Sequence, residues 1–232
     1  MIPLSNLQPN RYTSLPIMTL TLIVVNMLAL ILQFLLLEFN RDGYFQLIFL
    51  FGSVPTFVMS QQGAGALASI TSTFLHGGLL HLASNMLILW AFAQRVEDAC
   101  GPWRFLAFYL FCGVVADIIS TMSRSTEAIP GIGASGAVYG IMAAYLILYP
   151  KGRIQMLIFY GFGFWRVPFR AYWVILFYFL TEIPNALGVL LIDDVQSSVA
   201  HWAHLGGFFA GTLIFLFLRP DAFHRFRNEL PL

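Results

Sequence analysis

Four polar side chains in a mostly apolar sequence have the types and spacing that acyl-transfer chemistry requires. Ser135 is a candidate nucleophile and His204 a candidate base. A serine hydroxyl is a weak nucleophile until an adjacent base takes its proton, and imidazole, with an unperturbed pKa of about 6.5, does so near neutral pH. His81 and Asn85 lie four residues apart, on one face of a helix, where both can donate hydrogen bonds to the oxyanion of a tetrahedral intermediate. The four residues predict a hydrolase with a serine nucleophile.

The acidic residues of the apolar segments are interpreted as structural. A third group that orients the base is common in serine hydrolases but not obligatory, and a buried carboxylate is costly in a membrane. We therefore predict a dyad of Ser135 and His204, and we assign Asp117 and Glu182 to structural positions or to water near the rim. His201 is a rival base three residues before His204, but only His204 has the context Ala-His-x-x-Gly-x-x-x-Gly.

The composition places these side chains in a membrane protein. The chain has 232 residues, of which 59% are hydrophobic and only 10% are charged, whereas a typical soluble domain has about 25% charged residues. A chain with so few charges cannot cover its own surface in water, so its solvent must be lipid. A net charge of +1 provides no basic stripe for phosphates, which excludes nucleic acid as a partner and leaves the lipid bilayer.

Six apolar segments approach the roughly 20 residues that a membrane-spanning helix needs. They span residues 17–37, 79–94, 103–121, 135–149, 170–191 and 201–218. The expected fold is an all-α membrane protein, a six-transmembrane-helix bundle over residues 17–219, with a cytoplasmic N-terminal segment (1–16) and a cytoplasmic tail (220–232). We expect the apolar loop 38–78 to lie in the interface of the outer leaflet. The first apolar run is longer than a signal-peptide core, which predicts a retained helix.

The basic residues set the expected orientation. With the N-terminus in the cytoplasm, ten of the twelve Lys and Arg side chains face the cytoplasm and only Arg41 and Arg124 face outward, as the positive-inside rule requires. We expect both termini in the cytoplasm, a site that opens to the outer face, and the inner (plasma) membrane of a bacterium as the location.

Counting along the helices brings the two reactive groups to one depth. At about 1.5 Å per residue, Ser135 lies about 24 Å from Lys151, and His204 lies about 22 Å from Arg219. The Pro- and Gly-rich stretch 130–134 cannot readily begin a helix. Ser135 is therefore expected in the first turn of a short helix, on the floor of a water-filled notch.

Glycines indicate which helices meet. Gly136 and Gly140 form one G-x-x-x-G pattern, and Gly207 and Gly211 form another. Small residues four apart let helix backbones approach closely. Packing the two stripes together would bring the nucleophile and the base within hydrogen-bond reach.

Three motifs that occur in order on separate predicted helices resemble those of the rhomboid intramembrane serine proteases. They are His76-Gly-Gly-Leu-Leu-His81-Leu-Ala-Ser-Asn85, Gly133-Ala-Ser135-Gly136 with Tyr139, and Ala203-His204-Leu-Gly-Gly207-Phe-Phe-Ala-Gly211. The resemblance covers residues 76–211.

The resemblance implies a six-helix core, no cofactor, and cleavage of transmembrane protein substrates near the outer face; we expect no metal. It implies Ser135 as nucleophile and His204 as base, with the oxyanion held by His81, Asn85 and the Ser135 N–H. The expected supporting residues are Gly133, Gly136, Tyr139, Gly207 and His76. One departure is the absence of Trp from residues 38–78, where many family members carry a Trp-Arg pair that anchors the loop.

Two other functions agree with part of the sequence. A catalytically inactive rhomboid-like protein that binds membrane clients would normally lack the nucleophile or the base. A haem or metal protein would use His76, His81, His201 and His204, although no H-E-x-x-H motif occurs and no cysteine or acid completes such a site. For substrate entry, the segment 185–200 is a candidate lid and the fifth helix a candidate lateral gate.

Overall fold

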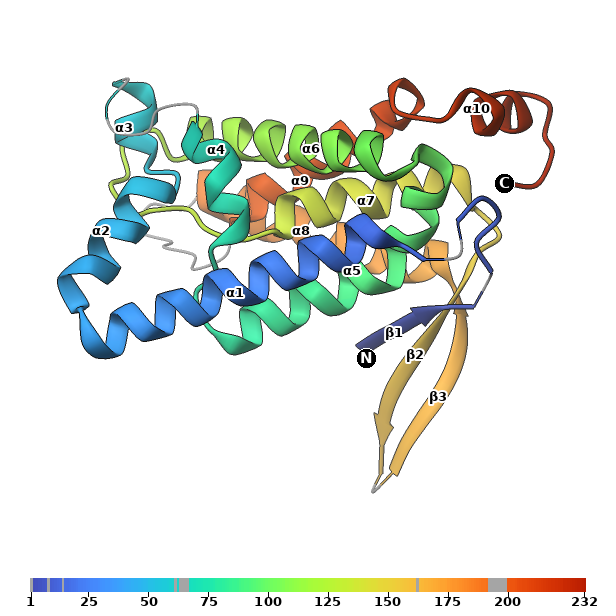
Figure 1. The fold of residues 1–232 in the computed structure, drawn as a ribbon, viewed down its shortest axis with the longest axis horizontal. Coiled ribbons are helices and arrows are strands. Elements are labelled where there is room, and N and C mark those ends of the chain that lie inside the picture. Colours follow the sequence, from blue (N-terminus) through green and yellow to red (C-terminus); the bar gives the residue numbers. More distant parts are fainter. Residues whose placement is uncertain are drawn as a thin grey trace.

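The chain forms a helical bundle with a small β-sheet at one end (Figure 1). The computed structural model describes residues 2–7, 9–13, 15–60, 62, 67–161, 163–191 and 200–232. The helices that coincide with the predicted segments are α1 (Ile17–Phe39), α5 (Leu79–Cys100), α6 (Pro102–Ser123), α7 (Ser135–Leu148), α8 (Ala171–Leu191) and α9 (His201–Gly211), which continues as the 3-10 helix η3 (Thr212–Leu216). The shorter helices are α2 (Arg41–Phe51), α3 (Pro55–Met59), α4 (Ala68–Thr71), η2 (Ser72–Phe74) and α10 (Pro220–Arg227). The predicted class, a helical membrane bundle, is confirmed.

Length and hydropathy identify the helices that can cross a membrane. Among the described residues, α1 and α6 are long and apolar enough to do so alone. Two bent pairs, Ala68–Phe74 with Leu79–Cys100 and His201–Leu216 with Pro220–Arg227, raise the number to four if each pair is one span. Helix α7 has 14 residues and is about 21 Å long, which is too short for a hydrocarbon core of about 30 Å. The number of six spans stays a prediction.

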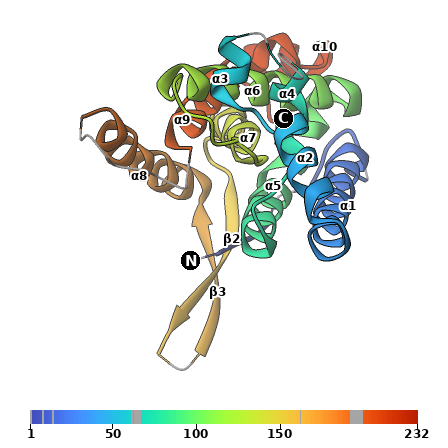
Figure 2. The same cartoon turned by 90° about the vertical axis from the view of Figure 1, so that its left-hand side faces the viewer.

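Helix α7 lies in the centre of the bundle (Figure 2). Helices α5, α6 and α9 pack around it, while α1 lies beyond α5 and α8 lies beside α9. Every residue from Gly136 to Tyr145 is buried. A helix that is apolar on all faces is stable where neighbouring helices cover every face. The small and apolar residues of α7 let its neighbours pack closely on all sides.

Glycines let α9 lie directly against the backbone of α7. A Cβ atom on Gly207 would collide with the carbonyl oxygen of Gly136, and one on Gly211 would collide with the carbonyl oxygen of Gly140. A Cβ atom on Gly140 would also lie 2.5 Å from Sγ of Cys112 on α6. The predicted contact between the two glycine stripes is confirmed.

The segment 38–78 is mostly helical and is tied to the end of the bundle where α7 begins. Asp117 on α6 accepts hydrogen bonds from Ser53 Oγ at 2.8 Å and from Ser69 Oγ at 2.5 Å. Backbone pairing between Ser53 and Gly131 joins the same segment to the loop before α7. These bonds anchor a segment that has no Trp, and they confirm the structural interpretation of Asp117.

Two carboxylates at the end of α5 hold the start of the chain. Glu97 accepts hydrogen bonds from the backbone N–H groups of Met18 and Thr19, each at 2.8 Å. Asp98 accepts hydrogen bonds from the backbone N–H groups of residues 11–13. The first N–H groups of a helix have no partner within that helix, and α1 carries no acid in its first turn. Glu97 therefore caps α1 from a neighbouring helix.

A three-stranded antiparallel sheet projects from the end of the bundle opposite α2 and α3 (Figure 1). Its strands, in the order β1-β2-β3, are β1 (Ile2–Asn6), β2 (Arg153–Tyr160) and β3 (Gly163–Arg170). Along β2, Ile154 and Met156 are buried and Arg153 is exposed, which is the alternation of a strand with one covered face. The sequence analysis did not predict this sheet.

We expect Gly207→Ala to destabilise the protein, because its methyl group would push α9 away from the Gly136 carbonyl. Overpacking of this kind costs about 1–3 kcal/mol. The measurement is the thermal unfolding midpoint of purified protein in detergent. Gly188→Ala on α8 is the matched control, because no atom lies within 4 Å of its added Cβ. An unchanged midpoint for Gly207→Ala would contradict the close packing.

Candidate active site

The structure brings Ser135 and His204 together. Ser135 is the first residue of α7, and His204 lies in the first turn of α9. Ser135 Oγ is 2.8 Å from His204 Nε2, which is hydrogen-bond distance. His204 is 7% exposed and Ser135 is partly exposed. This is the arrangement in which an imidazole can take the proton of a serine hydroxyl.

The ring of His204 is held by an aromatic neighbour one turn along α7. Tyr139 stacks on it, with ring centroids 4.4 Å apart and an angle of 7° between the planes. The hydroxyl of Tyr139 donates a hydrogen bond of 2.7 Å to Glu182 Oε1 on α8. The stack fixes the plane of the imidazole.

Two hydrogen-bond donors from α5 lie beside the loop that precedes Ser135. The ring of His81 lies close to Gly133, two residues before the serine. Asn85 is 5% exposed, and its Nδ2 has no hydrogen-bond partner among the described residues. A buried amide donor without a partner is costly unless a ligand or a reaction intermediate uses it.

Glycine is required at position 133 for two reasons. Its φ of +133° lies in a region that residues with a Cβ atom rarely adopt. A Cβ atom there would also lie 2.8 Å from Cε1 of the His81 ring. The Gly133 N–H donates a 2.9 Å hydrogen bond to the carbonyl of Ser72, which fixes the loop before α7.

His76 lies in the bend between η2 and α5 and is 1% exposed. Its backbone pairs with the side-chain amide of Gln33 on α1, through a 2.8 Å bond to the carbonyl oxygen and a 3.0 Å bond from the N–H. Its ring meets the ring of His81 edge-on at 5.1 Å. His76 therefore joins α1 to the start of α5 and lies behind His81.

A cavity of about 40 Å³ lies next to Ser135 and has polar groups in its wall. Its lining includes Asp117, Ser120 and Arg124 from the α6 side and Gly133 from the α7 side. One water molecule needs at least about 10–15 Å³ of such space and two or more polar partners. The cavity is therefore large and polar enough to hold water beside Ser135.

The structure corrects the assignment of Glu182. The sequence analysis found no acid placed to orient the base, but Glu182 Oε2 lies 3.0 Å from His204 Nδ1 and 2.5 Å from His201 Nδ1. Glu182 is 8% exposed, so it lies inside the bundle and not in water near a rim. The sequence did contain a signal for this site. Glu182 lies in the middle of an apolar helix, where an ionisable residue indicates function. The sequence could not show which face of α8 meets α9.

Glu182, His201 and His204 have potential metal-ligand atoms within 4.8 Å of one another. Among the described residues, His76 and His81 do not belong to this group, so the four histidines of the haem or metal hypothesis are not gathered. Both histidine Nδ1 atoms contact the same carboxylate oxygen at hydrogen-bond distance. The contact of His201 meets the geometry of a hydrogen bond, whereas His204 Nδ1 contacts the oxygen without that alignment.

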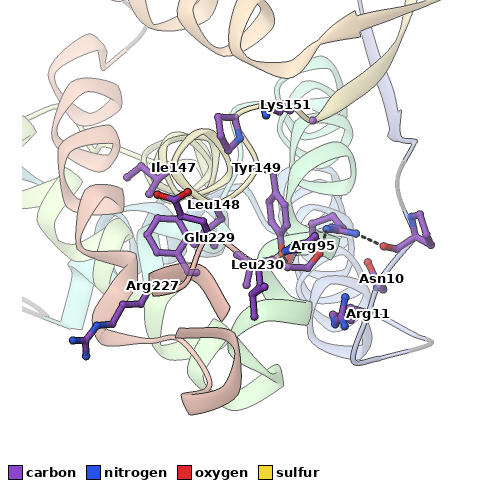
Figure 3. A pocket seen from close by; sticks show the side chains of 16 residues that line it. Asn10, Arg11, Arg95, Ile147, Leu148, Tyr149, Lys151, Arg227, Glu229 and Leu230 are labelled. Carbon is purple, nitrogen blue, oxygen red and sulfur yellow. Dashed lines mark hydrogen bonds between the residues drawn. The ribbon is translucent and has the colours of Figure 1, made fainter. Parts of the chain in front are cut away.

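A larger cavity, of about 990 Å³, lies at the other end of α7 (Figure 3). It borders Tyr149, which is 14 residues and about 21 Å of helix away from Ser135. The guanidinium of Arg95 lies 4.3 Å above the Tyr149 ring and donates hydrogen bonds to the carbonyls of Pro9 and Leu232. This cavity lies between the two terminal segments of the chain, and it is separate from the serine and histidine.

The fold and the site together define a helical membrane protein that holds a serine and a histidine at hydrogen-bond distance. A family model described as the Rhomboid domain matches residues 64–221, which is more than half of the chain. The chain therefore belongs to the rhomboid family and is an integral membrane protein. The resemblance found in the sequence motifs is confirmed.

Several curated relatives are about 30% identical to this chain over the residues that match. The mitochondrial presenilin-associated rhomboid-like protein of Homo sapiens is 30% identical over 146 residues, which cover 60% of this chain and 34% of that protein. Rhomboid protein 1, mitochondrial, of Saccharomyces cerevisiae is 32% identical over 149 residues (62% and 39%). RHOMBOID-like protein 5 of Arabidopsis thaliana is 31% identical over 154 residues (66% and 44%). The chain thus spans about a third to under a half of the length of these relatives.

Proposed function

We propose that the chain is an intramembrane serine endopeptidase that hydrolyses peptide bonds in or near transmembrane segments of membrane-protein substrates. The observation that carries the proposal is the 2.8 Å distance from Ser135 Oγ to His204 Nε2 inside a bundle of apolar helices. The rhomboid family consists generally of intramembrane serine proteases, although some members are inactive. An inactive, client-binding member would have no need of an intact serine and histidine pair.

In the first half of the proposed reaction, Ser135 Oγ attacks the carbonyl carbon of the scissile bond. His204 Nε2 takes the hydroxyl proton as the new C–O bond forms. The tetrahedral intermediate collapses when the C–N bond breaks, and the imidazolium of His204 returns its proton to the leaving amine. The product of this half is an ester between the substrate and Ser135.

The oxyanion of the intermediate needs donors, and three groups near Ser135 can supply them. The Nδ2 of Asn85 is a buried donor without a partner among the described residues, and His81 lies beside the Ser135 loop. The backbone N–H of Ser135 lies at the start of α7, where the first N–H groups of a helix are free and the helix dipole favours negative charge. Preorganised donors of this kind are often the largest single contribution to catalysis.

The second half of the reaction needs one water molecule at the ester. The 40 Å³ cavity beside Ser135 supports the proposal because it provides a polar place for that water within the bundle. His204 Nε2 takes a proton from the water as the hydroxide attacks the ester, and the proton then passes to Ser135 Oγ as the acid product leaves. The cycle returns the serine and the neutral imidazole.

The orientation proposed for the chain places both termini on one side of the membrane and the site toward the other. The basic side chains of Arg11, Arg95, Lys151 and Arg227 line the cavity at the end of the bundle away from Ser135, in line with the positive-inside rule.

The names of two reported relatives place those proteins in mitochondria, which argues against the bacterial inner membrane expected from the sequence.

The proposed lid, residues 185–200, falls in part on residues 192–199, which lie outside the described residues. Residues 185–191 belong to the end of α8, the proposed lateral gate, and Ala200 directly precedes α9. Helix α8 lies on the flank of the bundle and borders the site through Glu182 and α9 (Figure 2). An α8 movement would therefore open the site toward lipid, where a transmembrane substrate lies.

We expect Ser135→Ala and His204→Ala each to abolish cleavage of a model transmembrane substrate in detergent or proteoliposomes, because each removes one partner of the proton transfer. Ser123→Ala and His224→Ala are matched controls, since these side chains lie on α6 and α10 and line no part of the site. EDTA should leave the rate unchanged. Cleavage at the normal rate by Ser135→Ala would exclude Ser135 as the nucleophile. Client binding without cleavage by the native chain would favour the inactive member.

We expect Asn85→Ala to lower kcat by about 10²-fold, the usual loss for one oxyanion donor, with a small change in KM. The reason is that the Asn85 amide acts on charge that develops only in the transition state. Steady-state kinetics on the same substrate measure the effect, and the unfolding midpoint shows whether the variant is folded. A folded variant with an unchanged kcat would remove Asn85 from the site.

A further inference from the structure

The side of His204 that faces away from Ser135 meets a carboxylate from α8. Glu182 Oε2 lies 3.0 Å from His204 Nδ1, while Ser135 Oγ lies 2.8 Å from Nε2 on the other side of the ring. The carboxylate, the imidazole and the hydroxyl therefore follow one another in a row. They come from three helices, α8, α9 and α7.

We propose that Glu182 is a positioning residue for His204, so that the site works as Ser135–His204–Glu182 and not as a dyad. Glu182 holds the proton of the neutral imidazole on Nδ1 and stabilises the imidazolium that forms during the reaction. This inference rests on the proposed function, because it concerns how the base of that reaction is prepared.

Glu182 favours one tautomer of the neutral His204 ring. A neutral imidazole has one nitrogen that donates and one that accepts. Nε2 must accept the proton of Ser135, so Nδ1 must carry the ring proton. A carboxylate beside Nδ1 favours that tautomer, because an anion accepts hydrogen bonds and cannot donate one. With a donor in place of Glu182, the ring would protonate at Nε2 and could not act as the base.

The charge of Glu182 also acts on His204 during the reaction. When Nε2 takes the serine proton, His204 becomes a cation in a buried, apolar place, where an unpaired charge is costly. Glu182 lies 3.0 Å away and is 8% exposed, so its negative charge acts in a region of low dielectric constant. The interaction strengthens as the reaction proceeds, which is the condition for an interaction to raise kcat.

The contacts of Glu182 show how a carboxylate is kept in the middle of an apolar helix. Oε1 accepts the hydrogen bond from Tyr139 OH, and Oε2 also contacts His201 Nδ1 at 2.5 Å. Tyr139 in turn stacks on His204, so both atoms of the carboxylate restrain the same ring, directly or through the tyrosine. Oε2 is shared between the two histidines. It does not lie in line with the N–H bond of His204 Nδ1.

A merely structural role is the alternative. In that case Glu182 would clamp α7, α8 and α9 together, and its loss would lower stability without changing the chemistry of His204. The titratable groups that face His204 are Tyr139 on α7, Glu182 on α8, His201 on α9 and His81 on α5. Of these four, only Glu182 carries negative charge at neutral pH, so the pH dependence of catalysis separates the two roles.

The test compares kcat, KM and the rate–pH profile of Glu182→Gln, Glu182→Asp and the native chain on a model transmembrane substrate. Glutamine has the same shape, but its amide can donate to Nδ1 and carries no charge. We expect kcat to fall by about 10²-fold or more with little change in KM. The acid limb of the profile should move to lower pH, because the imidazolium loses its counter-charge. Aspartate, which keeps the charge, should restore part of kcat and return the acid limb toward its native position.

Thr181→Val is the matched control, because it is an isosteric change at the neighbouring, exposed position of α8. The inference is overturned if folded Glu182→Gln keeps the native kcat and acid limb, or if its loss of rate comes with an unmoved acid limb. If Glu182→Gln does not fold, kcat of folded Glu182→Asp decides, because the shorter side chain draws the carboxylate away from Nδ1. A native kcat in that variant overturns the inference. These failures leave Ser135→Ala and His204→Ala inactive, whereas failure of the proposed function leaves one of them active.

Discussion

The direct contact between the backbones of α7 and α9 determines where the reactive side chains lie. Gly207 and Gly211 rest against the carbonyl oxygens of Gly136 and Gly140, so the two helices are closer than any side chain would permit. Ser135 and His204 lie at the same end of this contact, one on each helix. The 2.8 Å hydrogen bond between them is therefore a consequence of helix packing, and it does not depend on a flexible loop.

The same bundle shows how ionisable groups are retained among apolar helices. Glu97 accepts bonds from the start of α1, Asp117 from serines of the segment 38–78, and Glu182 from Tyr139 on α7. In each case the donors belong to a different element from the acid. A buried carboxylate without such partners would be costly, so each one joins two or more parts of the fold. Glu182 differs from the others because one of its neighbours is the base of the proposed reaction.

The sequence predicted the helices and the pair of Ser135 and His204 because the relevant information is local. Apolar length, a proline- and glycine-rich stretch and two G-x-x-x-G patterns can be recognised without knowledge of the tertiary structure. The contact of Glu182 with His204 could not be predicted, because it depends on which face of α8 turns toward α9. The sheet was missed for a similar reason, since Ile2 pairs with Leu157 across more than 150 residues.

Covalent labelling tests the central claim most directly, namely that helix packing activates one serine. The purified chain in detergent would react with a serine-directed fluorophosphonate, and mass spectrometry of the digested protein would map the modified residue. The account predicts one modified site, Ser135, and loss of labelling in His204→Ala, because the hydroxyl is activated only by the imidazole beside it. Modification of another serine, or undiminished labelling of Ser135 in His204→Ala, would contradict it.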